Sequence, residues 1–137
     1  MTTDTVIELK DLHKSYGELE VLKGVGIRAE RGDVVSLIGS SGSGKSTLLR
    51  CANLLEDSQQ GDVIFEGDPV NWRGTAQARR PSDAAQVRHI RTNLCMVFQQ
   101  FNLWAHMTIL ENVMEAPVTV LGRAKSEVEA SARKYLE

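Results

Sequence analysis

One stretch of the sequence has residues whose types and spacing suit the binding of phosphate. Residues 39–46 read Gly-Ser-Ser-Gly-Ser-Gly-Lys-Ser and match the P-loop pattern G-x-x-x-x-G-K-[ST]. Glycines let such a loop turn its backbone N–H groups toward phosphate oxygens, because no Cβ stands in the way. In this chemistry Lys45 reaches the β- and γ-phosphates, and the Ser46 hydroxyl can ligate Mg²⁺.

The residues on either side supply the context that the pattern needs. The apolar, β-branched run at residues 34–38 predicts a buried strand. Leucines and alanine recur on one helical face of residues 46–55, so a helix is expected to begin near Lys45 and to direct its positive end at the phosphates. The alternative, a serine-glycine turn with an incidental lysine, does not explain this order of elements. The expected phosphate-binding residues are Gly39, Ser40, Ser41, Gly42, Ser43, Gly44, Lys45, Ser46 and Thr47.

Composition is that of an ordinary globular domain. The 137 residues are 42% hydrophobic and 25% charged with a formal net charge of −2, which gives no reason to expect nucleic acid or anionic lipid as a partner. The N-terminus lacks the features of a signal peptide, and no apolar run reaches membrane-spanning length, so a membrane role is expected to come through a partner. Cys51 and Cys95 lie in apolar segments without metal-ligand spacing and are expected to be reduced core residues rather than a disulfide.

Strands are expected before and after the P-loop region. The apolar residues at 6–9 and the alternating residues at 21–29 predict two antiparallel strands, with a turn at Tyr16-Gly17 between them. Another strand is expected over residues 62–67. A minimal mononucleotide kinase would usually begin at the P-loop strand, so the two leading strands are informative.

The middle of the chain carries arginines with few acids nearby. Residues 71–82 are expected to form a surface loop, and Ser82 is expected to cap a short helix. The arginines permit two interpretations, a solvated insertion or a patch for an anionic ligand or partner, and the first is favoured. His89 is expected to be exposed rather than catalytic. The arginines concerned are Arg73, Arg79, Arg80, Arg88 and Arg91.

The apolar run at residues 94–98 predicts a strand buried on both faces, ending at Gln99. The end of a buried strand is where an α/β sheet places ligand-contacting side chains, although a glutamine that merely caps the surface is equally consistent. Beyond it, Thr108 and Ser126 each open a capping-box pattern, so the C-terminal third is expected to be helical. The expected buried faces are Ile109, Val113 and Ala116 in the first helix and Val128, Ala132 and Tyr135 in the second.

Together these stretches resemble the N-terminal portion of an ATP-binding subunit of an ABC transporter. The likeness is to subunits that energise bacterial import of polar amino acids of the histidine, arginine and glutamine type. The resemblance implies an α/β P-loop fold with N-terminal antiparallel strands, a partial parallel core sheet and the start of a helical subdomain. Residues 1–98 would be the core and β subdomain, and residues 99–137 the Q-loop and the beginning of the helical subdomain. The motifs that carry it are residues 14–17 (Lys-Ser-Tyr-Gly), the P-loop, residues 96–103 and residues 104–117.

The resemblance also implies roles for residues outside the P-loop. Tyr16 would stack on the adenine of ATP, whereas taken alone it suggests half-buried packing. Gln99 would contact Mg²⁺ and the attacking water. Phe101 to Glu111 would lie beside the surface that receives the membrane permease, which would explain the apolar side chains there. A second ATPase subunit, forming a homodimer at the cytoplasmic face of the membrane, and indirectly a periplasmic binding protein are the further implied partners.

Several motifs of that family do not occur in this sequence. It contains no Ser-Gly-Gly-Gln signature, no apolar run ending in Asp-Glu (Walker B), and no histidine at the expected switch position. We therefore expect an ABC-type domain truncated on its C-terminal side, with ATP and Mg²⁺ as ligands and with Lys45 and Gln99 as the catalytic-site groups present. Two alternatives stay open: a non-catalytic fragment that only binds nucleotide or permease, and a small P-loop kinase. Strands without neighbours would make the chain marginally stable.

Overall fold

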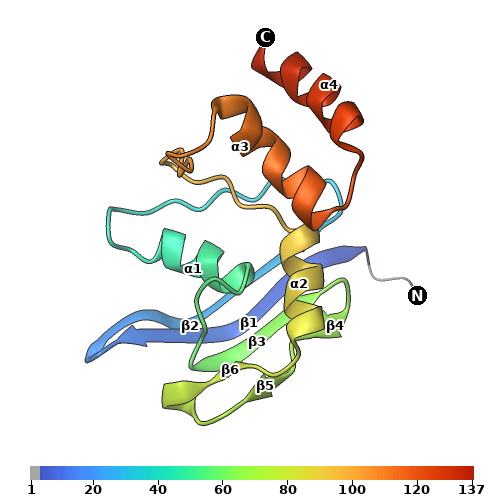
Figure 1. The fold of residues 1–137 in the computed structure, drawn as a ribbon. Coiled ribbons are helices and arrows are strands. Elements are labelled where there is room, and N and C mark those ends of the chain that lie inside the picture. The colour runs from blue at the N-terminus through green and yellow to red at the C-terminus, as the bar shows by residue number, and fades with distance from the viewer. Residues whose placement is uncertain (1–3) are drawn as a thin grey trace. The chain divides into compact units, whose positions relative to one another are not determined.

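The chain folds as two compact units. The computed structural model describes residues 4–137; the first unit ends at Met96 and the second begins at Val97. Figure 1 shows the helices and strands of the chain. The first unit contains all six strands and two of the helices of the described residues, and the second unit is helical. No helix in the described part of the chain is long and apolar enough to cross a bilayer.

A four-stranded antiparallel sheet forms the base of the first unit. β1 (Thr5–Tyr16) pairs on one edge with β2 (Leu19–Glu30) and on the other with β3 (Gln60–Phe65), and β4 (Asp68–Pro69) extends the sheet beyond β3. The three strands expected in this region are therefore confirmed. β1 and β2 are longer than predicted, because the polar residues near the end of β1 stay in the ladder, with irregularities in its register.

The core of the first unit lies between this sheet and two helices (Figure 1). α1 (Lys45–Ala52) contributes Leu48 and Cys51, and α2 (Ala84–Asn93) contributes Ile90. Each fully buried side chain of this size stabilises the folded state by about 1.5–3 kcal/mol relative to exposure. The sheet residues of the same cluster include Leu9, Leu12, Leu22, Val63 and Phe65.

The two strands expected for a parallel core sheet are not formed. Residues 33–40 carry no secondary structure, and Val34 and Ile38 are 92% and 95% exposed. Residues 95–98 also lie outside any strand, and Val97 is 95% exposed. A strand satisfies its backbone groups through a neighbour, and within residues 4–137 no strand pairs with either segment. The apolar runs mark residues suited to burial, but burial needs a partner that these residues do not supply.

Two other expectations about apolar residues are also wrong. Cys95 is exposed, because the segment that carries it is not a buried strand, whereas Cys51 is buried as expected. Of the leucines expected on one buried face of residues 46–55, Leu48 is buried, but Leu49 and Leu55 are 51% and 44% exposed. Cys51 is buried beside Leu48, and α1 ends at Ala52, before Leu55. Both cysteines are free thiols.

The arginine-rich segment is a small hairpin rather than a loop. β5 (Trp72–Arg73) pairs with β6 (Arg80–Pro81), and a 3-10 turn (Ala76–Ala78) connects them. The Arg79 guanidinium lies 4.2 Å from the centre of the Trp72 ring and 3.8 Å from a carboxylate oxygen of Asp62. Arg79 is therefore packed rather than solvated, and its burial lowers its pKa.

The helix after this hairpin is capped by a different residue from the one expected. The Asp83 carboxylate accepts hydrogen bonds from the N–H groups of Ala85 and Gln86, while the Ser82 hydroxyl donates to the Asn71 carbonyl. Asp83 holds the N-cap because it directly precedes the first helical residue. His89 on this helix is exposed, as expected.

The second unit consists of α3 (Ile109–Glu115), a π-helical turn (Ala116–Val120) and α4 (Lys125–Leu136). The capping box at Thr108 is confirmed: its hydroxyl accepts the Glu111 N–H, and its own N–H donates to the Glu111 carboxylate at 2.7 Å. These bonds from Thr108 lower the pKa of Glu111. A small core of Met114, Val128 and Ala132 joins the helices.

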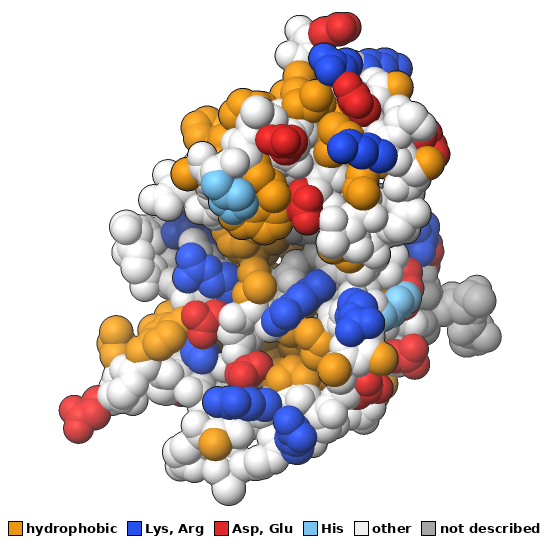
Figure 2. All heavy atoms as spheres, in the orientation of Figure 1, with side chains coloured by type: hydrophobic (Ala, Val, Ile, Leu, Met, Phe, Trp, Pro, Cys, Tyr) orange, Lys and Arg blue, Asp and Glu red, His pale blue; other side chains and the backbone are white. Residues whose placement is uncertain are grey.

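The other capping box and part of the expected buried faces are wrong. α4 begins at Lys125 with Ala124 as N-cap, so Ser126 lies inside the helix and cannot cap it. Ile109 and Tyr135 are 53% and 82% exposed, since the two helices meet through Met114 and Val128. Figure 2 shows hydrophobic side chains at the surface over α3. Val113 and Ala116 are exposed as well.

Candidate functional site

The P-loop follows a long segment without secondary structure and ends at the first residue of α1. The chain turns at Ser41–Gly42, and the Ser43 N–H donates to the Ser40 carbonyl at 3.3 Å. Gly44 is the N-cap of α1 in the left-handed conformation, with φ of 90°. This path encloses a hollow of about 290 Å³, lined by residues 41–47 and by Val21 of β2. The P-loop residues expected from the sequence thus border one common space, except Gly39 and Ser40.

Gly39 and Ser40 do not line this hollow, but their carbonyl groups contact the side chain of Lys45 in the same loop. The Lys45 ammonium donates hydrogen bonds to the Gly39 carbonyl at 2.8 Å, the Ser40 carbonyl at 2.7 Å and the Ser43 hydroxyl at 3.2 Å. All three partners are neutral oxygens of the loop itself. Because hydrogen bonds between ionised groups are stronger, an anionic phosphate oxygen can compete for this ammonium.

Two glycines of the loop stand where a side chain would collide. A Cβ on Gly39 would lie 2.6 Å from the Ser43 hydroxyl oxygen, in the space around the lysine. A Cβ on Gly44 would lie 3.0 Å from Cγ1 of Val21, at a φ that L-residues rarely adopt. The close packing of Gly44 on β2 therefore holds the start of α1 against the sheet.

The start of α1 is suited to an anion. The first helical hydrogen bond runs from the Leu48 N–H to the Gly44 carbonyl at 2.8 Å. The N–H groups of Lys45, Ser46 and Thr47 precede it and have no partner within the helix. The first turn contains no acidic residue, so the partial positive charge of the helix end is not offset there.

The donor set at this site fits a magnesium ion that arrives with a nucleotide. Ser46 is exposed and offers one hydroxyl oxygen. Among residues 4–137, no cluster of three or more His, Cys, Asp or Glu side chains could hold a metal by itself. Mg²⁺ normally takes one or two protein oxygens and completes its shell with phosphate oxygens and water. Ser46 can therefore serve as a protein ligand of a phosphate-bound ion.

Tyr16 lies in the same unit, at the end of β1. Tyr16 is 45% exposed, and the Lys14 ammonium lies 5.0 Å from the centre of its ring. Tyr16 pairs with Leu19 across the hairpin, and Val21, two residues further along β2, lines the P-loop hollow. β2 thus links the aromatic ring to the phosphate loop. A half-exposed ring fits both interpretations of Tyr16, packing and stacking.

Gln99 and the apolar segment after it belong to the second unit. Gln99 is exposed in a bend, and its role toward Mg²⁺ stays a prediction. Phe101 is 92% exposed, and Leu103 and Trp104 are 48% and 50% exposed. This segment has an ordered base, because the Asn112 side chain accepts the Trp104 N–H at 2.8 Å and donates to the Trp104 carbonyl at 3.2 Å.

Two polar residues have structural roles at these sites that were not assigned from the sequence. Asn112 is one; its signal is an asparagine in the second turn of a helix, within reach of the preceding backbone. Lys14 is another, only 8% exposed, with its ammonium 3.1 Å from the Glu56 carboxylate and 2.7 Å from the Asp57 carbonyl. The sequence feature that could have indicated its role is a lysine two residues before Tyr16, on the buried face of a strand.

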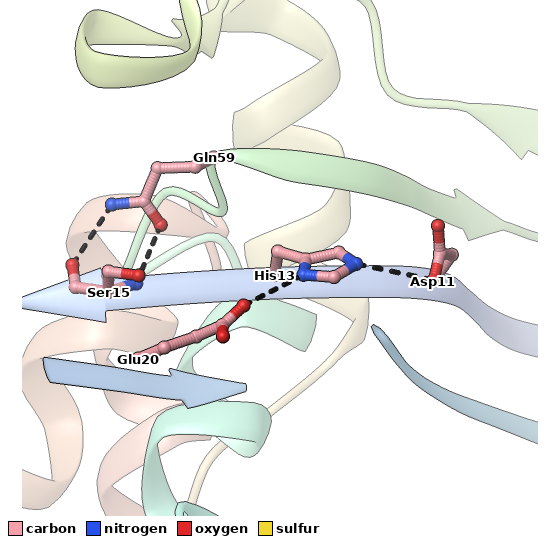
Figure 3. A network of polar contacts seen from close by, with 5 residues as sticks. All are labelled: Asp11, His13, Ser15, Glu20 and Gln59. Carbon is pink, nitrogen blue, oxygen red and sulfur yellow. Dashed lines mark hydrogen bonds and ion pairs between the residues drawn. The ribbon is translucent and has the colours of Figure 1, made fainter. Parts of the chain in front are cut away.

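A polar network surrounds the end of β1 (Figure 3). His13 contacts the carboxylates of Glu20, at 3.0 Å, and Asp11, at 3.4 Å. The hydrogen bond to Glu20 raises the pKa of His13. On the opposite edge of β1, the Gln59 side chain bonds both backbone groups of Ser15. These contacts fix the backbone immediately before Tyr16.

Comparison with known proteins gives concordant matches. The family model described as ABC transporter matches residues 22–137. Over 98% of its length the chain is 53% identical to the histidine/lysine/arginine/ornithine transport ATP-binding protein HisP of Escherichia coli (strain K12), covering 52% of that protein. Over 95% of its length it is 53% identical to the arginine/ornithine transport ATP-binding protein AotP of Pseudomonas aeruginosa, covering 52% of it. The chain thus spans about half the length of these relatives.

Solved structures of ATP-binding cassettes also match this chain. The dimeric structure of a bacterial ABC transporter cassette matches with a TM-score of 0.73 and 34% identity, over 90% of this chain and 53% of that one. A dimeric post-hydrolysis state of an ATP-binding cassette bound to ADP and Pi matches with a TM-score of 0.72 and 32% identity, over 93% of this chain and 54% of that one.

Proposed function

Because this chain belongs to the ABC transporter family, we propose that it binds the triphosphate of ATP in its P-loop and forms the nucleotide-binding half of an ATPase subunit that energises import of polar amino acids. One observation carries the proposal. The Lys45 ammonium points back into a glycine loop at the start of α1, where it contacts Gly39 and Ser40 through neutral carbonyls. This arrangement places one full positive charge and a set of backbone N–H donors around the same space.

Different residues of the loop would contact the phosphate oxygens and the magnesium ion. The N–H groups of residues 41–47 would bind the phosphate oxygens, and the hollow that they line is large enough for phosphate groups. Lys45 would exchange the neutral Gly39 and Ser40 carbonyls for anionic phosphate oxygens, which are stronger acceptors for an ammonium. Ser46 would hold the magnesium ion. Bound Mg²⁺ would neutralise charge on the phosphates.

Tyr16 would support the base. Its ring is half exposed at the end of β1, and β2 connects this end of the hairpin to the wall of the P-loop hollow. Stacking of an aromatic ring on a purine removes apolar surface of both from water. Gln99 would contact Mg²⁺ and the attacking water, as the resemblance to the family implies.

Coupling to transport is proposed for the complete subunit, of which the chain matches about half. The names of its relatives HisP and AotP refer to transport of basic amino acids. The exposed apolar side chains Phe101, Leu103 and Trp104 would dock on a membrane permease at the cytoplasmic face of the membrane. A second copy of the subunit would complete the ATPase.

Isothermal titration of the chain with Mg²⁺-ATP tests the nucleotide site. Lys45→Ala removes the loop ammonium and is expected to weaken binding by about tenfold or more, the size of a charged hydrogen bond. Lys23→Ala makes the same change at an exposed residue of β2 and serves as the control, with an effect of about twofold or less. Equal binding by wild type and Lys45→Ala would contradict the proposal.

A further inference from the structure

β1 extends beyond the strand that pairs with one of its edges. The pairing of β1 with β3 ends at His13 and Gln60, whereas β1 continues to Tyr16. The Gln59 N–H makes the last backbone contact on this edge, to the His13 carbonyl at 2.9 Å. From Ser15 onward, this edge of β1 therefore lacks a strand to receive its backbone hydrogen bonds.

The side chain of Gln59 takes the place of that missing strand residue (Figure 3). Its Oε1 accepts the Ser15 N–H at 3.0 Å, and its Nε2 donates to the Ser15 carbonyl at 3.0 Å. A carboxamide presents one acceptor and donors, as a peptide group does, and can satisfy both backbone groups of one residue. On the other edge Ser15 pairs with Glu20 of β2. Ser15 is thus held from both sides.

Ser15 lies between Lys14 and Tyr16, whose ammonium group and aromatic ring contact one another. Lys14 and Tyr16 lie on the same face of β1, because side chains alternate along a strand. The Lys14 ammonium is anchored by Glu56 and by the Asp57 carbonyl and lies 5.0 Å from the Tyr16 ring centre. Movement of the Ser15 backbone would therefore shift the ring relative to the cation beneath it.

We propose that Gln59 is a positioning residue for the nucleotide base: by pairing with Ser15 it holds the Tyr16 ring in the orientation that stacks on adenine. This inference rests on the proposed function, in which Tyr16 contacts the base. Gln59 is not among the residues that line the P-loop hollow, and its side-chain hydrogen bonds go to Ser15. It therefore adds to affinity for the base and not to affinity for the phosphates.

Two ligands separate these contributions. Binding of Mg²⁺-ATP and of Mg²⁺-tripolyphosphate, which has no base, is measured for the wild type, Gln59→Met, Tyr16→Ala and the double variant. Gln59→Met keeps the length of the side chain but removes both hydrogen bonds, and is expected to weaken ATP binding about fivefold. Its tripolyphosphate binding stays within about twofold of wild type. In the Tyr16→Ala background, Gln59→Met has no further effect on ATP, because Gln59 acts through Tyr16.

Two further variants serve as a control and as a second test of the Gln59 side chain. Gln60→Met makes the same change at the next residue, which is exposed, and leaves ATP binding unchanged. Gln59→Glu keeps the acceptor for the Ser15 N–H but places a carboxylate oxygen opposite the Ser15 carbonyl, so ATP affinity is expected to fall here as well. It also provides the comparison if Gln59→Met does not fold.

Three results would overturn the inference alone: an equal loss of ATP and tripolyphosphate affinity in the Gln59 variants, no loss for either ligand, or a loss that adds to that of Tyr16→Ala. Failure of the wild-type chain to bind either ligand would instead overturn the proposed function and this inference with it. That outcome is visible before any variant is compared.

Discussion

The Lys45 ammonium donates a hydrogen bond to the Gly39 carbonyl, 2.8 Å away, and so joins the two ends of the P-loop. The ring that results has no room for a Cβ on Gly39, which would lie 2.6 Å from the Ser43 hydroxyl. The loop is therefore specified by sterics as well as by charge. Its geometry comes from residues adjacent in sequence, within a turn and the first residue of a helix.

Substitution of glycine at the start of α1 should separate backbone strain from packing. Gly44 and Gly32 have nearly equal φ, 90° and 91°, but only at Gly44 does a Cβ meet neighbours, on Val21 and Leu22. Each change to alanine should lower the free energy of unfolding by about 1–2 kcal/mol through the left-handed conformation. Gly44→Ala should cost more in denaturant unfolding and should also weaken ATP binding. Equal effects of the two variants on stability and on binding would contradict the observed packing.

The exposure of residues 34–38 can be tested by truncating valines. Val34 is 92% exposed and Val63 is fully buried, so Val34→Ala should change the free energy of unfolding by less than about 0.5 kcal/mol. Val63→Ala should cost about 2 kcal/mol, because it leaves a cavity in the core. Denaturant unfolding of both variants measures the difference. Similar losses would show that residues 34–38 are buried in this chain.

Strand prediction from the sequence succeeds in some segments of the chain and fails in others. Apolar runs predict strands correctly for β1, β2 and β3, because these strands find neighbours among the described residues. The runs at residues 34–38 and 94–98 are also apolar but have no neighbour there, and the sequence of one segment cannot show whether its pairing partner is present. The family and the fold class depend on motifs rather than on pairing, and the comparisons confirm both.

The candidate site also contains contacts that could be predicted from the sequence and one that could not. The P-loop and the Thr108 capping box were predictable because their contacts join residues a few positions apart. The pairing of Gln59 with Ser15 spans 44 residues and exists only because β3 begins at Gln60, opposite His13, while β1 continues past His13 to Tyr16. Its register is a property of the folded sheet, and no local pattern at either residue indicates it.

The two cysteines should differ in reactivity. Burial is the main cause that raises the pKa of the Cys51 thiol, to about 11, whereas Cys95 is exposed. Because the raised pKa favours the protonated thiol in the folded state, stability from this group is present below the ordinary cysteine pKa and is lost as pH rises toward 11. A disulfide reagent at pH 8 should label one thiol quickly and the second only after unfolding in guanidinium.

The control for this labelling is Cys95→Ser, which should remove the fast reaction and leave the slow one. Rapid labelling that persists in Cys95→Ser would show that the Cys51 thiol is accessible, against its 1% exposure.

Binding of the phosphates of ATP by the P-loop can be followed one residue at a time. Titration of ¹⁵N-labelled protein with Mg²⁺-ATP, followed through backbone amide resonances, tests it most directly, because each N–H donor reports separately. The largest shifts are expected on residues 41–47. Tripolyphosphate should reproduce these shifts, and Lys45→Ala should reduce them. No shifts, or shifts confined to residues outside the loop and the end of β1, would contradict it.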